Sequence, residues 1–261
     1  GLLPWQDFTA IQRYFWQEKQ IYDELSALSI VNEEKEVLAI DHQDNAVIIR
    51  IRNETTHYSF NSYLASNEGK LGKLINIFPP VYDPHNDPPT NPWYKNTKQA
   101  NTFIRQILVS SPKGLNEPSL HLASLMPFYD RHAIFKGVVF ACSSLSRIGD
   151  FLTSLKIAKT GQAFVIDHQG LLIATSSGET PFIPGFMTTD NLQSLNKYDP
   201  VKRRLNVVNS SNLVTQKAAS YLKNRFTDFK SINNPQQLSM DIDGKPYFVQ
   251  VTPLQNEKDL E

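Results

Sequence analysis

Three side chains that could bind a metal ion alternate along a proline-rich stretch, residues 81–95, with the sequence VYDPHNDPPTNPWYK. They are Asp83, His85 and Asp87, and carboxylates and imidazoles are common ligands of divalent metals. The stretch also contains four prolines, and polar residues between prolines are typical of solvent-facing turns. We therefore interpret the three residues as solvated turn residues, and we predict neither a metal site nor a cofactor.

The same stretch carries aromatic side chains that could contact a small molecule. Tyr82, Trp93 and Tyr94 lie in a segment that can form neither a helix nor a central strand, because proline lacks the backbone donor and fixes φ. Two interpretations are open. The loop holds its aromatic groups over a ligand, or Trp93 and Tyr94 simply anchor the loop on the fold.

Motifs of the common enzyme classes are missing from the sequence. It contains no GxGxxG, no P-loop, no HExxH and no GxSxG pattern. The single cysteine, Cys142, follows two apolar residues on a predicted strand, which suits a buried core thiol better than a nucleophile. One cysteine allows neither an intramolecular disulfide nor a cysteine-rich zinc site. We expect this chain to be non-catalytic.

The bulk composition limits the partners. The chain has 261 residues, with 26 basic and 26 acidic side chains, and this balance argues against nucleic acid, which requires a basic face. We interpret the short basic run Lys202-Arg203-Arg204 as a solvated surface turn. No apolar run reaches the 18 residues of a membrane span, no signal peptide is present, and the first residues look cut from something longer.

The first element predicted to position these side chains is a helix. Its apolar residues fall on one helical stripe: Phe8, Ile11, Phe15, Tyr22, Leu25 and Leu28. We predict one long amphipathic helix from Trp5 to about Ser29. Its stripe could form the seam of a homodimer.

The remaining pattern is one of hairpins and short helices. Residues 46–52 alternate as a strand, residues 61–73 are weakly helical, and residues 95–108 suggest a helix that passes into a strand.

Hairpins are predicted over residues 119–144, 162–176 and 239–254. A helix over 148–155, with Ser144 or Ser146 as its cap, follows the first hairpin, and another helix covers 214–225. Because the strands come as hairpins, the sheets should be antiparallel and the fold class α+β.

Three motifs, in the order in which they follow one another along the chain, resemble those of double Cache sensor domains. Residues 156–176, KIAKTGQAFVIDHQGLLIATS, are similar to the joint between the two modules of that family, where a glycine-containing turn leads into a Phe-hydrophobic-Ile-Asp strand. Residues 126–152 resemble the family's segment with Y-D, G-V and F-L elements, and the proline stretch resembles its Y-D-P-R-x-R-P-W-Y segment. The resemblance covers residues 5–256 and is strongest over 82–176.

The resemblance implies an architecture and a location. A long N-terminal stalk helix (1–35) would precede two PAS-like modules, each a central antiparallel sheet flanked by helices. The membrane-distal module (36–150) would bind the ligand, and the membrane-proximal module (151–261) would follow. The domain would be extracytoplasmic, or periplasmic, between two transmembrane helices outside these residues. Its receptor would carry a histidine kinase, nucleotide cyclase, diguanylate cyclase or chemotaxis output.

In the amino-acid-binding members of this family, the distal pocket resembles a trap for the ligand carboxylate. This sequence keeps only part of the residues that form it. Tyr82 matches the tyrosine that starts their loop, and Trp93 and Tyr94 match their Trp-Tyr pair. The resemblance implies that these aromatic residues would line a distal pocket.

Both charged anchors of that trap are replaced. Asn91 stands where the family has a carboxylate-binding arginine, and Cys142 stands where it has the aspartate that holds the ligand amine. Val109 falls near the position of a strand tyrosine. Because a buried ligand charge left unpaired is costly, we do not expect an α-amino acid held in that manner.

The expected binding site is consequently aromatic and apolar, for a neutral or weakly polar small molecule. Its candidate residues are Tyr82, Asn91, Trp93, Tyr94, Val109, Ser124, Met126 and Cys142. Met126 and Cys142 could equally be plain core residues. We expect a small-molecule sensor domain. The alternative is a structural or dimerisation ectodomain whose degenerate pocket binds no small ligand.

Overall fold

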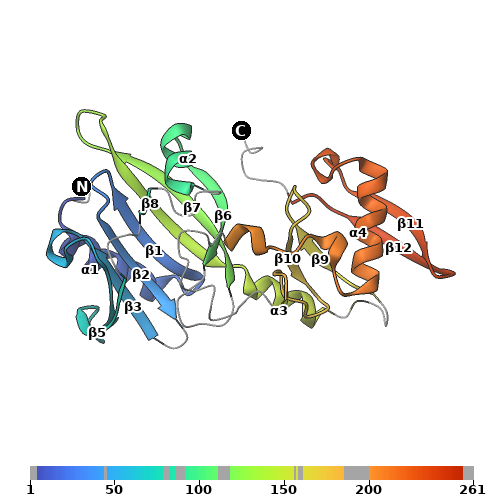
Figure 1. Ribbon diagram of the computed structural model, residues 1–261, viewed down its shortest axis with the longest axis horizontal. Coiled ribbons are helices and arrows are strands. Elements are labelled where there is room, and N and C mark those ends of the chain that lie inside the picture. The colour runs from blue at the N-terminus through green and yellow to red at the C-terminus, as the bar shows by residue number, and fades with distance from the viewer. Residues whose placement is uncertain are drawn as a thin grey trace. The chain divides into compact units, whose positions relative to one another are not determined.

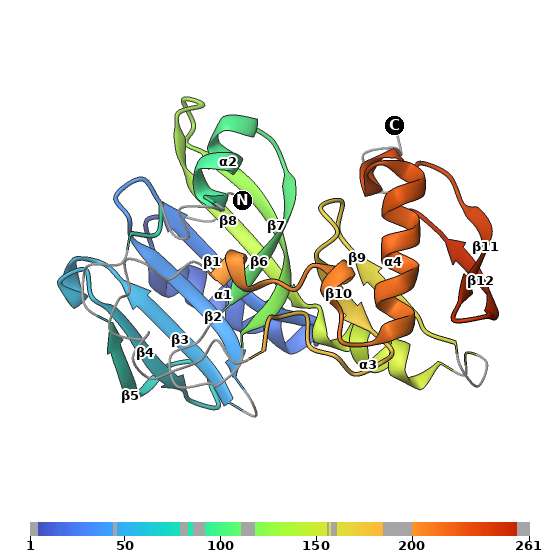
Figure 2. The ribbon, with the colours of Figure 1, turned by 45° about the vertical axis from the view of Figure 1, so that its right-hand side comes forward.

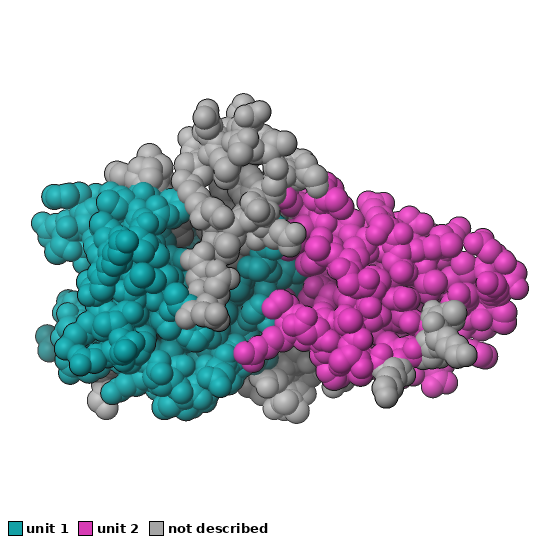
Figure 3. All heavy atoms as spheres, turned by 90° about the horizontal axis from the view of Figure 1, so that it is seen from below, with its two compact units in different colours: residues 1–144, 197–201 teal, residues 145–196, 202–261 magenta. Residues whose placement is uncertain are grey.

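The structure, a computed structural model, describes residues 5–43, 46–78, 83–85, 92–110, 118–155, 157, 161–184 and 200–254. Internal contacts divide the chain into two compact units, which Figure 3 shows in separate colours. Unit 1 comprises residues 1–144 and 197–201, and unit 2 comprises residues 145–196 and 202–261.

Unit 1 is built on one eight-stranded sheet with the order β5-β4-β3-β2-β1-β8-β7-β6 (Figure 1). Its strands are β1 (Leu25–Asn32), β2 (Val37–Gln43), β3 (Ala46–Arg52), β4 (Phe60–Ala65), β5 (Leu71–Phe78), β6 (Ile104–Ser110), β7 (Ser119–Tyr129) and β8 (Phe135–Ser144). Every neighbouring pair is antiparallel. The predicted α+β class with antiparallel strands is confirmed.

Helix α1 (Phe8–Ile21) packs on one face of this sheet (Figure 2). The side chain of Asp7 accepts a hydrogen bond from the backbone N–H of Ala10 and begins the helix. Ile11 and Phe15 are buried against β1 and β2, in a cluster with Leu28, Ile30, Leu38, Ile40 and Ile49. Ile11 and Phe15 of the predicted apolar stripe therefore belong to the unit's own core, and a homodimer through this helix stays a prediction.

The predicted length of this helix is wrong, because α1 ends at Ile21 and β1 begins at Leu25. Leu25 and Leu28 fit helical spacing, but residues 28–32 are all buried. Such a continuous buried run is typical of a central strand that is covered on both faces. Residues 5–35 thus contribute both the helix and the central strand of unit 1.

Residues 61–73, predicted as weakly helical, form β4, a turn and the start of β5 instead. Gly69 has a φ of +73° in that turn, and a Cβ there would lie 2.3 Å from the ring of Trp16 on α1. The helix therefore packs directly on the turn, where only glycine fits. Strand β5 is the exposed edge of the sheet, so its apolar residues show no one-sided burial.

Helix α2 (Trp93–Ala100) packs on the opposite face of the sheet, over β6, β7 and β8 (Figure 1). The predicted passage from helix to strand over residues 95–108 is confirmed, since Asn101 ends α2 in the left-handed conformation and β6 follows. The hairpin of β7 and β8 is confirmed as well.

In unit 2, helix α3 (Ser146–Ser154) precedes the confirmed hairpin of β9 (Phe164–Ile166) and β10 (Leu172–Thr175). The N-cap residue of α3 is Leu145, whose side chain makes no capping hydrogen bond, so the predicted serine cap is wrong. Helix α4 (Leu213–Phe226) and the hairpin of β11 (Gln236–Ile242) and β12 (Lys245–Val251) complete the regular elements. Short 3-10 turns cover Glu54–Thr56, Pro200–Arg203, Val207–Asn209 and Phe229–Ser231.

The basic run of unit 2 is not a solvated turn, as Arg203 is 3% exposed and Arg204 is 8% exposed. The guanidinium of Arg204 lies 2.6 Å from a carboxylate oxygen of Asp167. It also donates to the carbonyls of Leu171 and Leu172, where β10 begins. Charge patterning alone missed this burial because the partner lies 37 residues earlier in the sequence.

Candidate functional site

Trp93 and Tyr94 open helix α2 and turn their rings to the sheet. Trp93 is 6% exposed and Tyr94 only 2%. The Trp93 ring lies 4.9 Å from the ring of Phe140 on β8 and meets the Tyr94 ring edge-on at 5.7 Å. The hydroxyl of Thr97 donates to the Trp93 carbonyl one turn below. Tyr82 and Asn91, also expected at the site, lie outside the described residues.

Cys142 lies on the same face, in one buried cluster with Trp93 and Tyr94. Burial, with a smaller effect from the carboxylate of Asp41, raises the pKa of the Cys142 thiol to about 12. A thiol with that pKa stays protonated at neutral pH, and protonated thiols are poor nucleophiles. Cys142 therefore behaves as a buried apolar side chain of this cluster.

We call this side of the sheet the α2 face. Strand pairing fixes its members, because directly opposed residues point the same way. In the inner strands they are Cys142, Phe140 and Val138 on β8, Ala27, Ser29 and Val31 on β1, Asp41, Ala39 and Val37 on β2, and Ile48, Arg50 and Arg52 on β3.

Three of the expected site residues point away from the α2 face. Ser124 and Met126 pair with Ala141 and Val139, which pack against the α1 core. Val109 on β6 has the same orientation, and Met126 is 50% exposed. Successive residues of a strand point to alternate faces of the sheet. The sequence alone does not show which residues of β7 share a face with Trp93, and grouping these three with Trp93 placed them on the wrong face.

A hydrogen-bonded network joins α2 to Glu33, the residue that follows β1. The hydroxyl of Tyr94 donates to Glu33 at 2.8 Å, and the ammonium of Lys98 lies 2.5 Å from the other oxygen of that carboxylate. Burial alone would raise the pKa of Glu33, but the hydrogen bonds from Lys98 and Tyr94 outweigh it and hold that pKa below its ordinary value. Burial, and then the bond to Glu33, raise the pKa of Tyr94.

His85 and Asp83 extend this network, and describing them as solvated turn residues was wrong. The His85 ring stacks on the Tyr94 ring at 3.9 Å, and its Nε2 lies 2.8 Å from the carbonyl oxygen of Asn32. Burial lowers the pKa of His85. Asp83 forms an ion pair with Lys35 at 2.9 Å. His85 is therefore engaged in packing the loop on α2.

Asp87, the third member of that set, lies outside the described residues. Across the described ranges, no three His, Cys, Asp or Glu side chains are grouped as metal ligands would be.

The α2 face also carries three charged residues that sequence reasoning missed. We call Asp41, Arg50 and Arg52 the charged strip. The Arg50 guanidinium lies 2.6 Å from Oδ2 of Asp41. Burial raises the pKa of Asp41, although Arg50 opposes this effect. Oδ1 of Asp41 and Nε of Arg52 are buried and have no hydrogen-bond partner among the described residues. Such atoms are uncommon in folded proteins and each one calls for an explanation.

Small side chains lie between the charged strip and the aromatic residues. Along one row of paired residues, Arg50 is followed by Ala39, Ser29 and Phe140. Ser29 is buried and donates to the Leu38 carbonyl. Ala39 and its neighbour Ala27, by contrast, are only partly buried even though they lie on central strands. We call Ala27 and Ala39 the alanine floor, and it is accessible from the α2 face.

The sequence held a signal for the charged strip. In AVIIRIR the two arginines alternate with isoleucines, so both must lie on one face of β3. That this face is the one covered by α2 depends on the pairing of β3 through β2 and β1 to β8, which the sequence does not contain.

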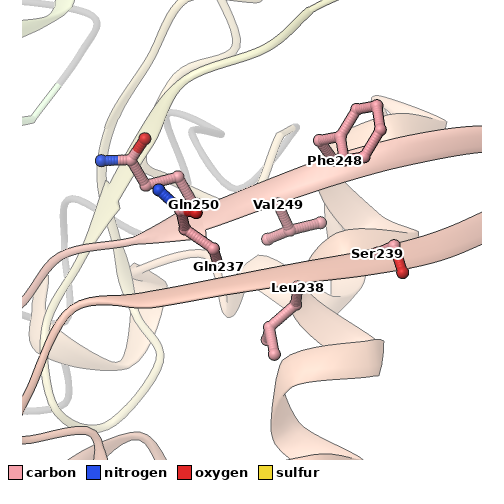
Figure 4. A pocket seen from close by; sticks show the side chains of 6 residues that line it. All are labelled: Gln237, Leu238, Ser239, Phe248, Val249 and Gln250. Atoms are coloured by element: carbon pink, nitrogen blue, oxygen red, sulfur yellow. The ribbon is translucent and has the colours of Figure 1, made fainter.

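Two surface hollows lie among the described residues of unit 2. The larger, about 580 Å³, lies at the β11–β12 hairpin (Figure 4). Its lining includes Leu238 and Phe248, which project from opposite faces of the hairpin, and Phe248 is 93% exposed. The smaller, about 280 Å³, lies beside the C-terminal end of α4, near Lys223 and Phe229. A hollow lined from both faces of a thin ribbon is an outer surface, so the larger hollow does not replace the α2 face as the candidate site.

Comparison with known proteins gives the fold a context. No protein-family profile matches the sequence, and no curated protein matches it. Among solved structures, the chain is similar to the extracellular domain of mmHK1S-Z2, a protein described as a histidine kinase. The TM-score is 0.50 and the identity 14%, over 95% of this chain and 77% of that one.

Two chemoreceptor domains are more distant. The sensory domain of Tlp3 from Campylobacter jejuni gives a TM-score of 0.46 at 11% identity, over 93% of this chain and 67% of that one. The ligand-binding domain of PctC from Pseudomonas aeruginosa, in complex with GABA, gives 0.40 at 16% identity, over 64% and 57%.

The fold expected from the Cache resemblance is thus confirmed, and at these identities the likeness extends to the fold alone. None of the helices in the described ranges has the length and hydropathy of a membrane span.

Proposed function

We propose that this chain is the extracytoplasmic sensor domain of a membrane receptor, and that it binds a small molecule on the α2 face of unit 1. The fold shared with a histidine kinase's extracellular domain supports the first part. The observation that carries the second part is the accessible alanine floor, Ala27 and Ala39, between the charged strip and the aromatic side chains. Small-molecule sites typically combine such apolar surfaces with a few fixed polar groups.

A bound molecule would act by favouring one of two arrangements of the unit. Ligand binding shifts a conformational equilibrium only by the difference in affinity for the two states. Strands β1 and β2 present the alanine floor on one face and the residues that contact α1 on the other. A ligand that contacts the alanine floor would therefore touch the same two strands that support α1. The receptor's output would be a kinase, a cyclase or a chemotaxis module.

One observation favours the alternative, an ectodomain that binds no small ligand. Trp93, Tyr94 and Cys142 are almost fully buried among one another, as loop anchors and core residues would be. In that case the α2 face is only a packing surface. The two functions differ in whether any metabolite stabilises unit 1.

The test is a thermal-shift screen of a metabolite library against three proteins. Ala39→Leu fills the floor, and Ala100→Leu adds the same side chain at an exposed position of α2. We expect compounds that raise the melting temperature of the original chain and of Ala100→Leu, but not that of Ala39→Leu. Compounds that act equally on all three would place binding elsewhere, and a screen without any hit would favour the ligand-free ectodomain.

A further inference from the structure

We propose that residues 83–85, which we call the clamp, hold helix α2 in place only while His85 is neutral, so that acid loosens the helix that covers the α2 face. The clamp consists of Asp83, Pro84 and His85. Its contacts with α2 and with the turn between β1 and β2, residues 33–36, carry this inference, and no ligand is needed for it. Its regulatory role rests on the proposed function, because the clamp sets how firmly the candidate site is covered.

The clamp joins α2 to the end of β1. The His85 ring lies flat on the Tyr94 ring, with centres 3.9 Å apart and planes 13° apart. Its Nε2 lies 2.8 Å from the carbonyl oxygen of Asn32, the last residue of β1, and a carbonyl can only accept, so Nε2 carries a proton and donates it. Pro84 is buried, and Asp83 accepts a hydrogen bond from the backbone N–H of His85. One imidazole thus connects the helix with the sheet.

Helix α2 depends on such contacts for its position. It has only eight residues, and Pro92 at its N-cap makes no side-chain capping bond. Helices of this length are not stable by themselves in water. The Tyr94 hydroxyl and the Lys98 ammonium bind Glu33 of the turn. The His85 ring adds a stacked contact at Tyr94, so without it α2 would be held over the sheet by fewer contacts.

Both carboxylates that act on the His85 ring already have partners. The charged side chains of the elements packed around the ring are Glu33, Glu34, Lys35 and Glu36 of the turn, Lys98 of α2, Arg52 of β3 and Asp83 of the clamp. Glu33 and Asp83 attract a proton to the ring, whereas Lys35 opposes it. Each of these two carboxylates is held in an ion pair, with Lys98 and Lys35 respectively. Burial of the ring outweighs their attraction, so the pKa of His85 lies below its ordinary value of 6.5.

The direction of the pH effect follows from this lowered pKa. Protonation would place an additional positive charge on a half-buried ring, and burying a charge costs free energy. The clamp is therefore at full strength above about pH 6.5, and it weakens as the pH falls from there toward the folded-state pKa of His85. Because His85 takes up one proton, its protonation changes the equilibrium between the closed and the open helix by at most about tenfold per pH unit.

The experiment measures how often α2 exposes the thiol beneath it. Cys142 is 6% exposed and belongs to the buried cluster of Trp93 and Tyr94, so a reagent reaches it only when the helix moves away. The whole chain is labelled with dithiodipyridine, a disulfide reagent that reacts with thiols in acid as well as at neutral pH. The labelling rate of the urea-unfolded chain, divided by that of the folded chain at the same pH, gives the protection of Cys142.

The protection of Cys142 should depend on pH. We expect it to fall by at least about threefold between about pH 7.5 and about pH 5.5, because the clamp weakens over this range. Protection that stays constant, or falls by less than this, would overturn the inference.

Variants then assign the pH dependence to its residue. His85→Gln keeps an N–H donor for the Asn32 carbonyl but cannot titrate, so its protection should change less with pH than that of the original chain. Burial lowers the pKa of His42 and of His121 as well, and both histidines remain in this variant, so the comparison isolates His85. His132→Gln removes an exposed histidine of the same unit and should keep the whole pH dependence. Equal pH dependence in His85→Gln and in the original chain would refute the role of His85.

Two measurements remain if His85→Gln does not fold. His85→Phe keeps a flat ring to stack on Tyr94 and cannot titrate, so full pH dependence in that variant overturns the inference. An NMR titration of the original chain measures the His85 ring directly, and a pKa at or above 6.5 overturns it as well.

The labelling contains no ligand, so its result is separate from the test of the proposed function. If the protection of Cys142 falls with pH in the expected way but no metabolite stabilises unit 1, the clamp stands while small-molecule binding fails. If metabolites stabilise the original chain but not Ala39→Leu, and the protection does not change with pH, the sensor function stands while the clamp fails.

Discussion

Replacing Tyr94 with phenylalanine removes one hydroxyl and leaves its ring in place. That hydroxyl donates to the carboxylate of Glu33 at 2.8 Å, and the tyrosine is 2% exposed. A hydrogen bond to a charged group contributes about 1.5–3 kcal/mol. Glu33 keeps Lys98 as a second partner and is one-third exposed, so solvent partly replaces the lost bond. We therefore expect unit 1 to lose about 1.5 kcal/mol of unfolding free energy.

The loss should depend on pH with a defined sign. The folded-state pKa of Glu33 lies below its ordinary value, so its contribution to stability is present above that ordinary value and is lost as the pH falls through the folded pKa. Tyr94 is one cause of the lowering. The difference between the original chain and Tyr94→Phe should therefore be largest near neutral pH and shrink on acidification.

Urea unfolding followed by tryptophan fluorescence measures this difference. All three tryptophans, Trp5, Trp16 and Trp93, belong to unit 1, so the signal reports on that unit alone. Tyr22→Phe deletes the same atom from an exposed residue of the same unit and should change the unfolding free energy by less than about 0.5 kcal/mol. A Tyr94→Phe loss as small as this, or a loss that does not change with pH, would refute the reasoning.

Three further predictions use the same unit. Gly69→Ala should destabilise it by about 2 kcal/mol in urea, since the new Cβ meets the Trp16 ring at 2.3 Å and the φ is +73°; a neutral effect would show that α1 does not hold this turn. Cys142 should resist alkylation by iodoacetamide in the folded chain at mildly alkaline pH and react after unfolding, because its pKa is about 12; rapid labelling of the folded chain would contradict its burial. Met126→Ala should change stability by less than about 0.5 kcal/mol and leave every ligand response intact, because Met126 is half exposed on the face opposite α2; a lost response would return it to the site.

The sequence predicted those elements whose signals are local. The hairpin of β7 and β8 has a polar turn between two apolar runs, and the hairpin of β9 and β10 has Gly170 at a φ of +77°. These features act within a few residues, so one sequence is enough to find them. Leu25 and Leu28 were misread because their spacing fits both a helix and a strand, and only the burial of β1 between two neighbours decides between them.

The candidate site was less predictable, because it is assembled from strands far apart in the sequence. Trp93, Tyr94 and Cys142 were found through the family resemblance, and they do meet in one buried cluster. Arg50 and Arg52 escaped because nothing near them in the sequence reveals that β3 shares a face with β8, three strands away. Likewise, burial of Arg204 follows from Asp167, a partner that no local pattern identifies.

Strand β1 has different surroundings on its two faces: Ala27 is part of the alanine floor, while Leu28 and Ile30 support α1. A slip of one residue would exchange the two sides and expose the core, so this strand cannot respond to an occupant by sliding. The strand can therefore only tilt or bend within the sheet. Any displacement at Ala27 would consequently reach the helix across one strand, through the side chains of Leu28 and Ile30.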